Sequence, residues 1–410
     1  MKTTRSRILA LTAALAVTVL ICVTGYRIRS QESTTLAEVR AEKSPVAETA
    51  VELVGVPGRR WFERIFGICN ASALIVAGNG DFLIGDDETN DIYLVTAGQS
   101  AVKKITPSLN ELLRTAGIDL KKDGSEIREI DIEGGALVRW DGEEVALWIG
   151  SHSNRKVKRD KDDANKLRSA KKRKNRRLIV ATNVPSEGQS LELLGNPITN
   201  LRDIVADLEE PLKSIAEPLN SLPGDEYANA GGWNIEGFAV DGQNRCFIGF
   251  RSPVNSGGKT LVLGFSNLRS SFSGGELHPQ NGAWLALGKR GIRAMDWTVE
   301  RGEFVIVAGP VDHVDLVKAA TMSPIPEELP QIAGLAEDFA IFGWKGFGEQ
   351  PRKMDFDLSN LRPESVAIIS GGFYLISDDG KMERGNGFSC EDSRTAQYKK
   401  YCRAKYFVFD

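Results

Sequence analysis

Apolar and polar positions in this chain recur as pairs of short apolar runs joined by a tight turn. In residues 234–253 the first apolar run carries Glu236, the chain turns at residues 241–244, and a second apolar run ends on Arg251. Two runs of strand length around an Asp-Gly, Asn-Gly or Gly-Gly turn are the strongest short-range signal for a β-hairpin. This segment therefore predicts two antiparallel strands.

The same pattern recurs in four other segments, which are residues 70–88, 131–153, 291–310 and 362–380. Five irregularly spaced hairpins predict an all-β repeat fold rather than βαβ units. A β-propeller of five to six blades fits best, because its blades are antiparallel hairpins around a central channel and its closure leaves few exposed edges. Strand-like residues 50–56 and 406–409 could pair and complete one blade from both ends of the chain.

Two long insertions interrupt the hairpins, a basic loop at residues 154–177 and a helical segment at residues 197–232. The basic loop has 13 basic and 3 acidic residues on a chain whose net charge is −3. It could be a solvated loop folded back on the acidic body, or it could contact anionic lipid, polysaccharide or nucleic acid. Nucleic acid is the least expected partner, because the loop has no aromatic residue on which a base could stack. The candidate partner-binding residues are Lys171, Lys172, Arg173 and Lys174.

Helical spacing of apolar residues extends from Leu201 to Leu219, and Pro211 and Pro218 are expected to kink or divide that helix. Its apolar stripe should pack on the propeller, with a membrane-surface role as the alternative. A capping-box pattern at Ser108 and Glu111 predicts a shorter helix that runs to about residue 115.

The N-terminus indicates export. Lys2, Arg5 and Arg7 precede an apolar run over residues 8–25, which is typical of a signal peptide or a short membrane anchor. We interpret residues 1–25 as this segment, residues 26–49 as a polar linker and residues 50–410 as the propeller domain. We expect a bacterial protein that is periplasmic, or anchored to the inner membrane and facing the periplasm.

Four cysteines remain after residue 25, and an exported chain can form disulfides. Four cysteines allow three pairings. We predict a bridge between Cys390 and Cys402, which flank a polar segment. Cys69 and Cys246 lie in apolar runs and are interpreted as small core residues.

No motif in the chain names a mechanism. With only three histidines, a histidine-rich transition-metal site is not expected. A set of carboxylates is instead predicted to face the channel: Asp86, Asp87, Glu133, Glu236, Asp296, Glu364, Asp378 and Asp379. Among them, Glu133, Glu236 and Glu364 are candidate ligands for Ca²⁺ or Mg²⁺, which prefer oxygen ligands.

Three basic residues are candidate catalytic groups. Arg251, Arg293 and His152 could bind or polarise an anionic ester beside the carboxylates. Structural alternatives remain open for each group. The glutamates could pair with a neighbouring blade, the aspartate pairs could serve turns, and His152 could be a satisfied strand residue.

These segments resemble an uncharacterised bacterial family catalogued as domain of unknown function 3616. The resemblance rests on short pieces in order along the chain: residues 87–88, 131–134, 150–153, 235–237, 249–254, 292–293, 308–310, 363–364 and 378–380. Phe250 and Ser252 depart from the usual Leu and Gly, and residues 294–296 differ, which puts Asp296 in doubt as a site residue. The resemblance implies a propeller-like fold and a basic loop shared by the family, and it implies no established activity. At the level of fold alone, the Glu-Gly blades are also similar to esterase-like phytase propellers and calcium-dependent lactonases.

Two functions follow as hypotheses. The first is a binding or scaffold propeller of the cell envelope that holds a small anionic ligand or an envelope polymer. The alternative is a divalent-metal-assisted hydrolase of a small anionic ester or phosphoester. Direct Glu–Arg pairs across the channel would favour the first, and carboxylates that hold a cation would favour the second.

Overall fold

The computed structural model describes residues 63–118, 121–122, 126–127, 129–153, 174–221, 233–255, 257–311, 335–385 and 387–409. All of them lie in one compact unit, Thr49–Asp410. The predicted signal or anchor segment, the polar linker and the strand-like residues 50–56 lie outside the described residues. Among the described helices, none has the length and apolar character needed to cross a membrane.

The described strands form six sheets, and five of these are the blades of a propeller. Each blade is built mainly from consecutive antiparallel strands, as the hairpin signals predicted. Blade 1 contains β2 (Ala71–Val76), β3 (Phe82–Asp86), β4 (Ile92–Val95) and β5 (Lys103–Lys104). Blade 2 contains β8 (Ile132–Trp140), β9 (Glu143–Gly150) and β10 (Ile179–Asn183). Blade 3 contains β11 (Asn234–Val240), β12 (Cys246–Val254), β13 (Thr260–Ser266) and β14 (His278–Leu285).

The last two blades complete the circle. Blade 4 contains β15 (Gly291–Thr298), β16 (Glu303–Gly309), β17 (Ala340–Trp344) and β18 (Arg352–Met354). Blade 5 contains β19 (Pro363–Ile369), β20 (Gly372–Ser377), β21 (Tyr401–Val408) and β1 (Arg64–Phe66). A two-stranded ribbon, β6 (Lys121–Lys122) with β7 (Glu126–Ile127), stands apart from the blades.

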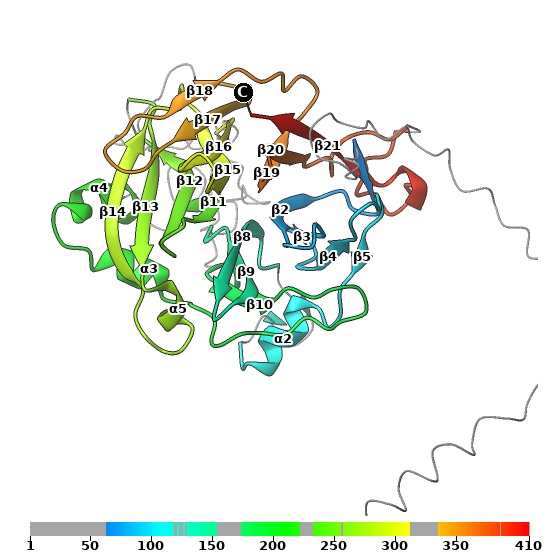
Figure 1. Cartoon of the computed structure of the whole chain (residues 1–410), viewed down its shortest axis with the longest axis horizontal. Coiled ribbons are helices and arrows are strands. Elements are labelled where there is room, and N and C mark those ends of the chain that lie inside the picture. The colour runs from blue at the N-terminus through cyan, green and yellow to red at the C-terminus, as the bar shows by residue number, and fades with distance from the viewer. Residues whose placement is uncertain are drawn as a thin grey trace, which may run out of the picture. The chain divides into compact units, whose positions relative to one another are not determined.

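The first strand of each hairpin lines the centre of the molecule (Figure 1). These inner strands are β2, β8, β11, β15 and β19, and each packs beside the next until β19 returns to β2. The ring of five inner strands confirms the all-β propeller prediction, with five blades in the described part of the chain.

Both ends of the described chain close the ring within blade 5. Strand β1 pairs antiparallel with β21 in a register that places Ile65 opposite Cys402. The sequence predicted closure of this kind between residues 50–56 and 406–409. In the structure the N-terminal partner is Arg64–Phe66, a three-residue strand too short to give a hairpin signal.

Apolar side chains fill the spaces between consecutive blades. The five largest core clusters each join two neighbouring blades. They lie between blades 1 and 2, 2 and 3, 3 and 4, 4 and 5, and 5 and 1. The propeller is therefore stabilised by apolar packing between the facing sides of neighbouring sheets around the axis. Trp148 illustrates this arrangement, because it projects from blade 2 toward blade 1 and is fully buried.

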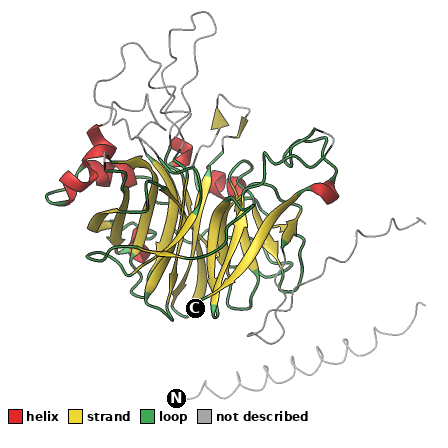
Figure 2. Ribbon diagram, turned by 90° about the horizontal axis from the view of Figure 1, so that it is seen from above, coloured by secondary structure: helices red, strands yellow, loops and turns green. Residues whose placement is uncertain are grey.

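Two helices of the second insertion cover part of this core. Helix α3 (Leu201–Ala206) and helix α4 (Leu212–Ser221) are separate, and Pro211 lies between them. Leu201, Val205 and Leu219 are buried in the cluster between blades 2 and 3, so the apolar stripe packs on the propeller. Most of the helical turns lie toward one end of the strands (Figure 2).

The remaining helical elements are short. Helix α2 (Leu109–Thr115) begins at Ser108 with the predicted capping box, in which Ser108 and Glu111 bond each other's backbone N–H groups. The others are α5 (Leu268–Ser271) and the 3-10 turns η1 (Lys174–Arg176) and η3 (Gln397–Lys399). Turn η1 lies inside the predicted basic loop, and residues 154–173 of that loop lie outside the described residues.

The disulfide prediction was wrong in its pairing. Cys390 is bonded to Cys69, and Cys402 is a buried free thiol. Cys402 belongs to β21 and lies in the core cluster between blades 5 and 1. The segment that carries Cys390 instead returns to the loop before β2, so proximity in sequence did not predict proximity in space.

Candidate functional site

A β-bulge near the start of each inner strand positions one side chain toward the propeller axis. In all five blades, the pairing between the first two strands shifts by one residue at the second or third residue of the inner strand. A bulge leaves one residue out of the ladder and re-aims its side chain. The residues left out, here named the channel ring, are Ser72, Glu133, Glu236, Arg293 and Glu364.

Channel-ring residues line a cavity of about 770 Å³ at the end of the propeller where the inner strands begin. Loops that follow β3 and β9 add Asp87 and Ser153, and strand β12 adds Arg251. Ten of the lining side chains are Asp or Glu, and five are Arg or Lys. The cavity is therefore strongly polar, with an excess of carboxylates.

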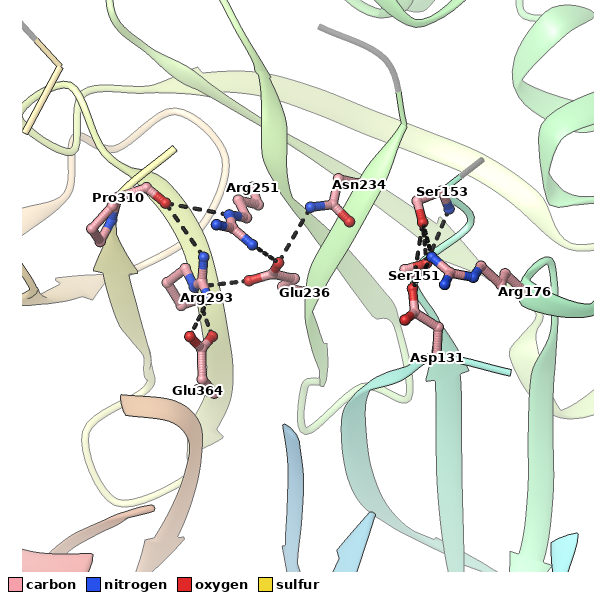
Figure 3. Close-up of polar contacts among 10 residues, drawn as sticks. All are labelled: Asp131, Ser151, Ser153, Arg176, Asn234, Glu236, Arg251, Arg293, Pro310 and Glu364. Atoms are coloured by element: carbon pink, nitrogen blue, oxygen red, sulfur yellow. Dashed lines mark hydrogen bonds and ion pairs between the residues drawn. The ribbon is translucent and has the colours of Figure 1, made fainter. Parts of the chain in front are cut away.

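On one side of the cavity, arginines and glutamates form a closed network (Figure 3). Arg293 lies between Glu236 and Glu364, with its Nε 2.9 Å from Glu236 Oε2 and 2.7 Å from Glu364 Oε2. Arg251 donates from Nη1 to Glu236 Oε1 at 2.8 Å. Both arginines also donate to the carbonyl oxygen of Pro310 at 3.3 Å. Each buried charge here thus has a partner, as the low dielectric of such a site requires.

On this side of the cavity, burial and ion pairing shift the pKa values of the buried groups in opposite directions. Burial by itself would lower the pKa of Arg293, but Glu236 and Glu364 outweigh it and raise that pKa. Burial raises the pKa of Glu364 to about 7, although Arg293 acts in the opposite direction. Arg293 therefore stays charged, and Glu364 can exchange a proton near neutral pH.

On the other side of the cavity, Arg176 holds the loop before β8. Its Nη1 lies 2.7 Å from Asp131 Oδ2 and donates to Ser153 Oγ at 2.6 Å. Glu129 is a further partner of the same guanidinium group. Arg176 ends the short turn η1, so the C-terminal end of the predicted basic loop supplies a cation to the cavity.

Asp87 and Glu133 lie next to this group, and among the described residues no cation lies within ion-pair distance of either one. Among the described residues, neither carboxylate takes part in an ion pair or accepts a hydrogen bond. The Oδ1 atom of Asp87 is fully buried without a partner, a situation that costs about 1–3 kcal/mol in a folded protein. One carboxylate oxygen from each of Asp87, Asp131 and Glu133 lies within 4.8 Å of the other two.

Burial, and then repulsion between neighbouring acids, raises the pKa values of Asp87 and Glu133. Burial is the largest cause for Glu133, followed by repulsion from Glu236, Asp131 and Asp87. For Asp87 burial is followed by repulsion from Asp131 and Asp378. Without a counter-ion, this side of the cavity favours protonated carboxyl groups.

His152 does not line the cavity, so its predicted place at the channel mouth was wrong. Its backbone has a φ of 54°, which separates its side chain from those of Ser151 and Ser153, and it is fully buried. The ring stacks on Trp233 with the centroids 5.9 Å apart. Burial, with Arg202 and Arg177 nearby, lowers the pKa of His152 well below its usual range. The neutral, packed imidazole fits the structural interpretation better than the catalytic one.

The other predicted carboxylates divide between the cavity and structural roles. Asp86 Oδ1 accepts the backbone N–H groups of Glu88 and Thr89, which is turn chemistry. Asp296 accepts backbone N–H groups of Trp297 and Ile368 and does not line the cavity, so the prediction that it faces the channel was wrong. Asp379 lines the cavity but is bound by Arg384 and Arg403.

Of the three predicted metal ligands, two are paired with arginines and only one is open to a metal ion. Glu236 and Glu364 lie in the channel ring as expected, yet Arg251 and Arg293 occupy them. Glu133 is the member of that set that remains open. Of the predicted partner-binding residues, Lys171, Lys172 and Arg173 lie outside the described residues, and Lys174 begins η1.

Several cavity residues were not found from the sequence. Ser72 is the channel-ring residue of blade 1, and its position before Ala73 matches Glu133 before Gly134, which is a signal that an alignment of the five hairpins contains. Arg362 and Lys381 also line the cavity as exposed cations. In the described part of the chain, no carboxylate lies within ion-pair distance of either one.

Residues 70–318 match the family described as "Protein of unknown function (DUF3616)". The chain belongs to this family. The match covers more than half of the chain and includes the channel-ring residues of blades 1 to 4, and it confirms the resemblance seen in the sequence. No curated protein matches the chain.

Solved structures that resemble the chain do so weakly. A PQQ-bound aldose sugar dehydrogenase from Streptomyces coelicolor is 12% identical over 84% of this chain and 96% of that chain, with a TM-score of 0.34. A GH43 β-1,3-galactosidase is 9% identical over 83% and 90%, with a TM-score of 0.39. RS223 β-xylosidase is 10% identical over 85% and 96%, with a TM-score of 0.40. At this level of similarity, none of the three indicates what this chain binds.

Proposed function

We propose that this member of the family is an exported binding propeller, and that its central cavity holds a small polar ligand with an anionic group. The proposal rests on one observation, which is that some cations of the cavity are paired with carboxylates and others are not. Arg251 and Arg293 are held by glutamates, whereas the exposed Arg362 and Lys381 line the cavity without a carboxylate at ion-pair distance. A guanidinium and an ammonium group presented in this way suit a carboxylate or phosphate group.

Direct Glu–Arg pairs support binding over catalysis. The network of Glu236, Arg293 and Glu364 uses the groups that a hydrolase would need to hold substrate. Its members hold each other and the backbone at Pro310, so they stabilise the cavity wall. Export to the envelope is supported by the basic and apolar N-terminal residues and by the disulfide between Cys69 and Cys390.

Titration calorimetry on the purified full chain tests this proposal. The probes are inorganic phosphate, citrate and glucose 6-phosphate, with uncharged glucose as the reference. We expect at least one anionic probe to bind, and we expect Arg362→Gln and Lys381→Gln each to weaken that binding about fivefold or more, as loss of one charged hydrogen bond predicts. The affinity should also fall as salt rises.

Matched controls lie outside the cavity. Arg114→Gln on α2 and Lys213→Gln on α4 remove the same charges from exposed helix positions and should leave binding unchanged. Equal binding by the cavity variants and these controls, or equal binding of glucose and its phosphate, would contradict the proposal.

A second candidate function is metal-assisted hydrolysis of a small ester or phosphoester. One observation favours it, namely the three carboxylate oxygens of Asp87, Asp131 and Glu133 near one another. Asp87, Asp131 and Glu133 would hold a divalent cation, which would supply an activated water, and Arg362 and Lys381 would hold the anionic ester. Turnover of p-nitrophenyl phosphate or p-nitrophenyl acetate that EDTA abolishes would favour the hydrolase, and anion binding without turnover would favour the binding protein.

A further inference from the structure

Two carboxylates beside Arg176 are left without an ion-pair partner. Arg251 and Arg293 pair with Glu236 and Glu364, and Arg176 pairs with Asp131. Among the described residues, no such partner faces Asp87 or Glu133. Both side chains can therefore offer a charged oxygen to a cation.

Asp87 gives a second and independent indication. Its Oδ1 atom has no solvent exposure and no hydrogen-bond donor, although the cavity is lined by groups that could donate. A buried oxygen in this state requires a cation, a donor or a proton to offset its loss of hydration. Asp131 and Glu133 place their own oxygens around the same point.

The number of carboxylates discriminates between cations. Ca²⁺ takes about six to eight oxygen ligands, several of which can be carboxylates. Mg²⁺ usually keeps several waters and is held by only one or two carboxylates. Three carboxylate oxygens lie within 4.8 Å of one another here, and three such ligands suit Ca²⁺ better than Mg²⁺.

We propose that Asp87, Asp131 and Glu133 bind one divalent cation in the central cavity, with Ca²⁺ preferred over Mg²⁺. Asp87 follows β3 of blade 1, whereas Asp131 immediately precedes β8 of blade 2 and Glu133 lies in that strand. The cation therefore links two neighbouring blades at the channel ring. Water molecules would complete its coordination, as they do in many Ca²⁺ sites. The site goes beyond the proposed function, because the cation needs no anionic ligand in order to bind.

The test is calorimetric titration of CaCl₂, and separately of MgCl₂, into the purified full chain after EDTA treatment and desalting. We expect one Ca²⁺ per chain and at least tenfold weaker binding of Mg²⁺. Glu133→Gln and Asp87→Asn keep the shape of each side chain and remove its charge, and each should weaken Ca²⁺ binding at least tenfold. Glu383→Gln is the matched control, because Glu383 lines the same cavity outside the cluster.

Thermal unfolding of the same proteins distinguishes ligation from folding defects. In EDTA, Glu133→Gln should unfold at the same temperature as the wild type or a higher one, since it removes repulsion. Added CaCl₂ should raise the melting temperature of the wild type and of Glu383→Gln and should leave that of Glu133→Gln unchanged. Asp87→Asn provides the same comparison if one of the two variants does not fold.

Two results would overturn the proposal. One is a folded wild type that takes up no Ca²⁺ at millimolar concentration, and the other is unchanged Ca²⁺ affinity in both Glu133→Gln and Asp87→Asn. The outcome is separable from that of the proposed function, because the anion titrations can be repeated in EDTA and in CaCl₂. Cation uptake without anion binding would leave this site standing and would reject only the anionic ligand.

Discussion

At the scale of single residues, one backbone position carries different chemistry in each blade. The channel ring consists of Ser72, Glu133, Glu236, Arg293 and Glu364, and each of these residues lies at the bulge of its inner strand. Because neighbouring blades bring these side chains together, a single arginine in blade 4 can neutralise the glutamates of blades 3 and 5. Glu133 lies near Arg176 and Arg293 but forms an ion pair with neither, so in our proposal its charge is available to a cation.

Asp296 shows how burial makes stability depend on pH. Burial raises its pKa to about 6 from the usual 3.8, although two backbone N–H groups stabilise the ionised form. Because the folded pKa is the higher one, its contribution to stability is fully present below about pH 4 and is lost as pH rises through about 6. We expect Asp296→Asn to flatten this part of the profile by about 2–3 kcal/mol between pH 4 and 7.

Urea unfolding at several pH values between 4 and 7 measures this effect. A constant offset of about 1 kcal/mol is expected for the hydrogen bond that an amide cannot replace. Asp207→Asn, at the exposed end of α3, is the control and should keep the profile of the wild type. If Asp296→Asn kept it as well, the pH dependence would have to arise elsewhere.

At the scale of elements, the inner strands approach one another so closely that small residues must follow the bulge. Ala73, Gly134, Gly237, Ala294 and Ser365 occupy this position in the five blades. At Gly237 an added Cβ would lie 2.5 Å from Ile292 Cγ2 and 3.1 Å from the Cα of Gly249. The hydrogen-only side chain allows β11 and β15 to pack side by side, and it thereby sets the distance between channel-ring residues.

We expect Gly237→Ala to destabilise the propeller by about 1–3 kcal/mol, because overpacking forces neighbouring groups to move. Urea or thermal unfolding measures the change. Gly242→Ala is a suitable control in the turn after β11, since its added Cβ would meet only Trp297 Nε1 at 3.7 Å. Equal stability of the two variants would show that the inner strands can separate at little cost.

At the scale of the whole molecule, residues from both ends of the described chain hold the ring closed. Strand β1 completes blade 5, and the disulfide between Cys69 and Cys390 joins positions 321 residues apart. The bond links the loop between blades 5 and 1 to the segment that precedes β21. It therefore fastens the place where the first and last blades meet.

Removal of this bond should reduce stability by about 2–4 kcal/mol. We expect Cys69→Ala to show this loss in urea unfolding, and we expect reductant to produce a similar loss in the wild type. Cys402→Ala truncates a buried free thiol of the same size and should remain sensitive to reductant. Peptide mapping by mass spectrometry under non-reducing conditions checks the pairing, and a linked peptide with Cys390 and Cys402 would contradict it.

The sequence by itself determined the local part of this architecture. Hairpins are contiguous, so turns such as Asp141–Gly142 and Gly371–Gly372 revealed the blades, and the position of each Glu or Arg at the start of a strand indicated the channel. On that basis Glu133, Glu236, Glu364 and either Arg293 or Asp296 were predicted to converge, and Arg293 rather than Asp296 lines the cavity with the three glutamates. The capping box of α2 was predictable for the same reason, because its partners are three residues apart.

Only the tertiary structure decided which of these groups are already satisfied. Glu236 meets Arg293, Asp131 meets Arg176, and Cys390 meets Cys69 across separations that no sequence pattern encodes. Likewise the positive φ of His152 turned its ring to Trp233 and away from the cavity. Pairing in a low-dielectric interior depends on distances between blades, and those distances are set by how the five sheets pack around the axis.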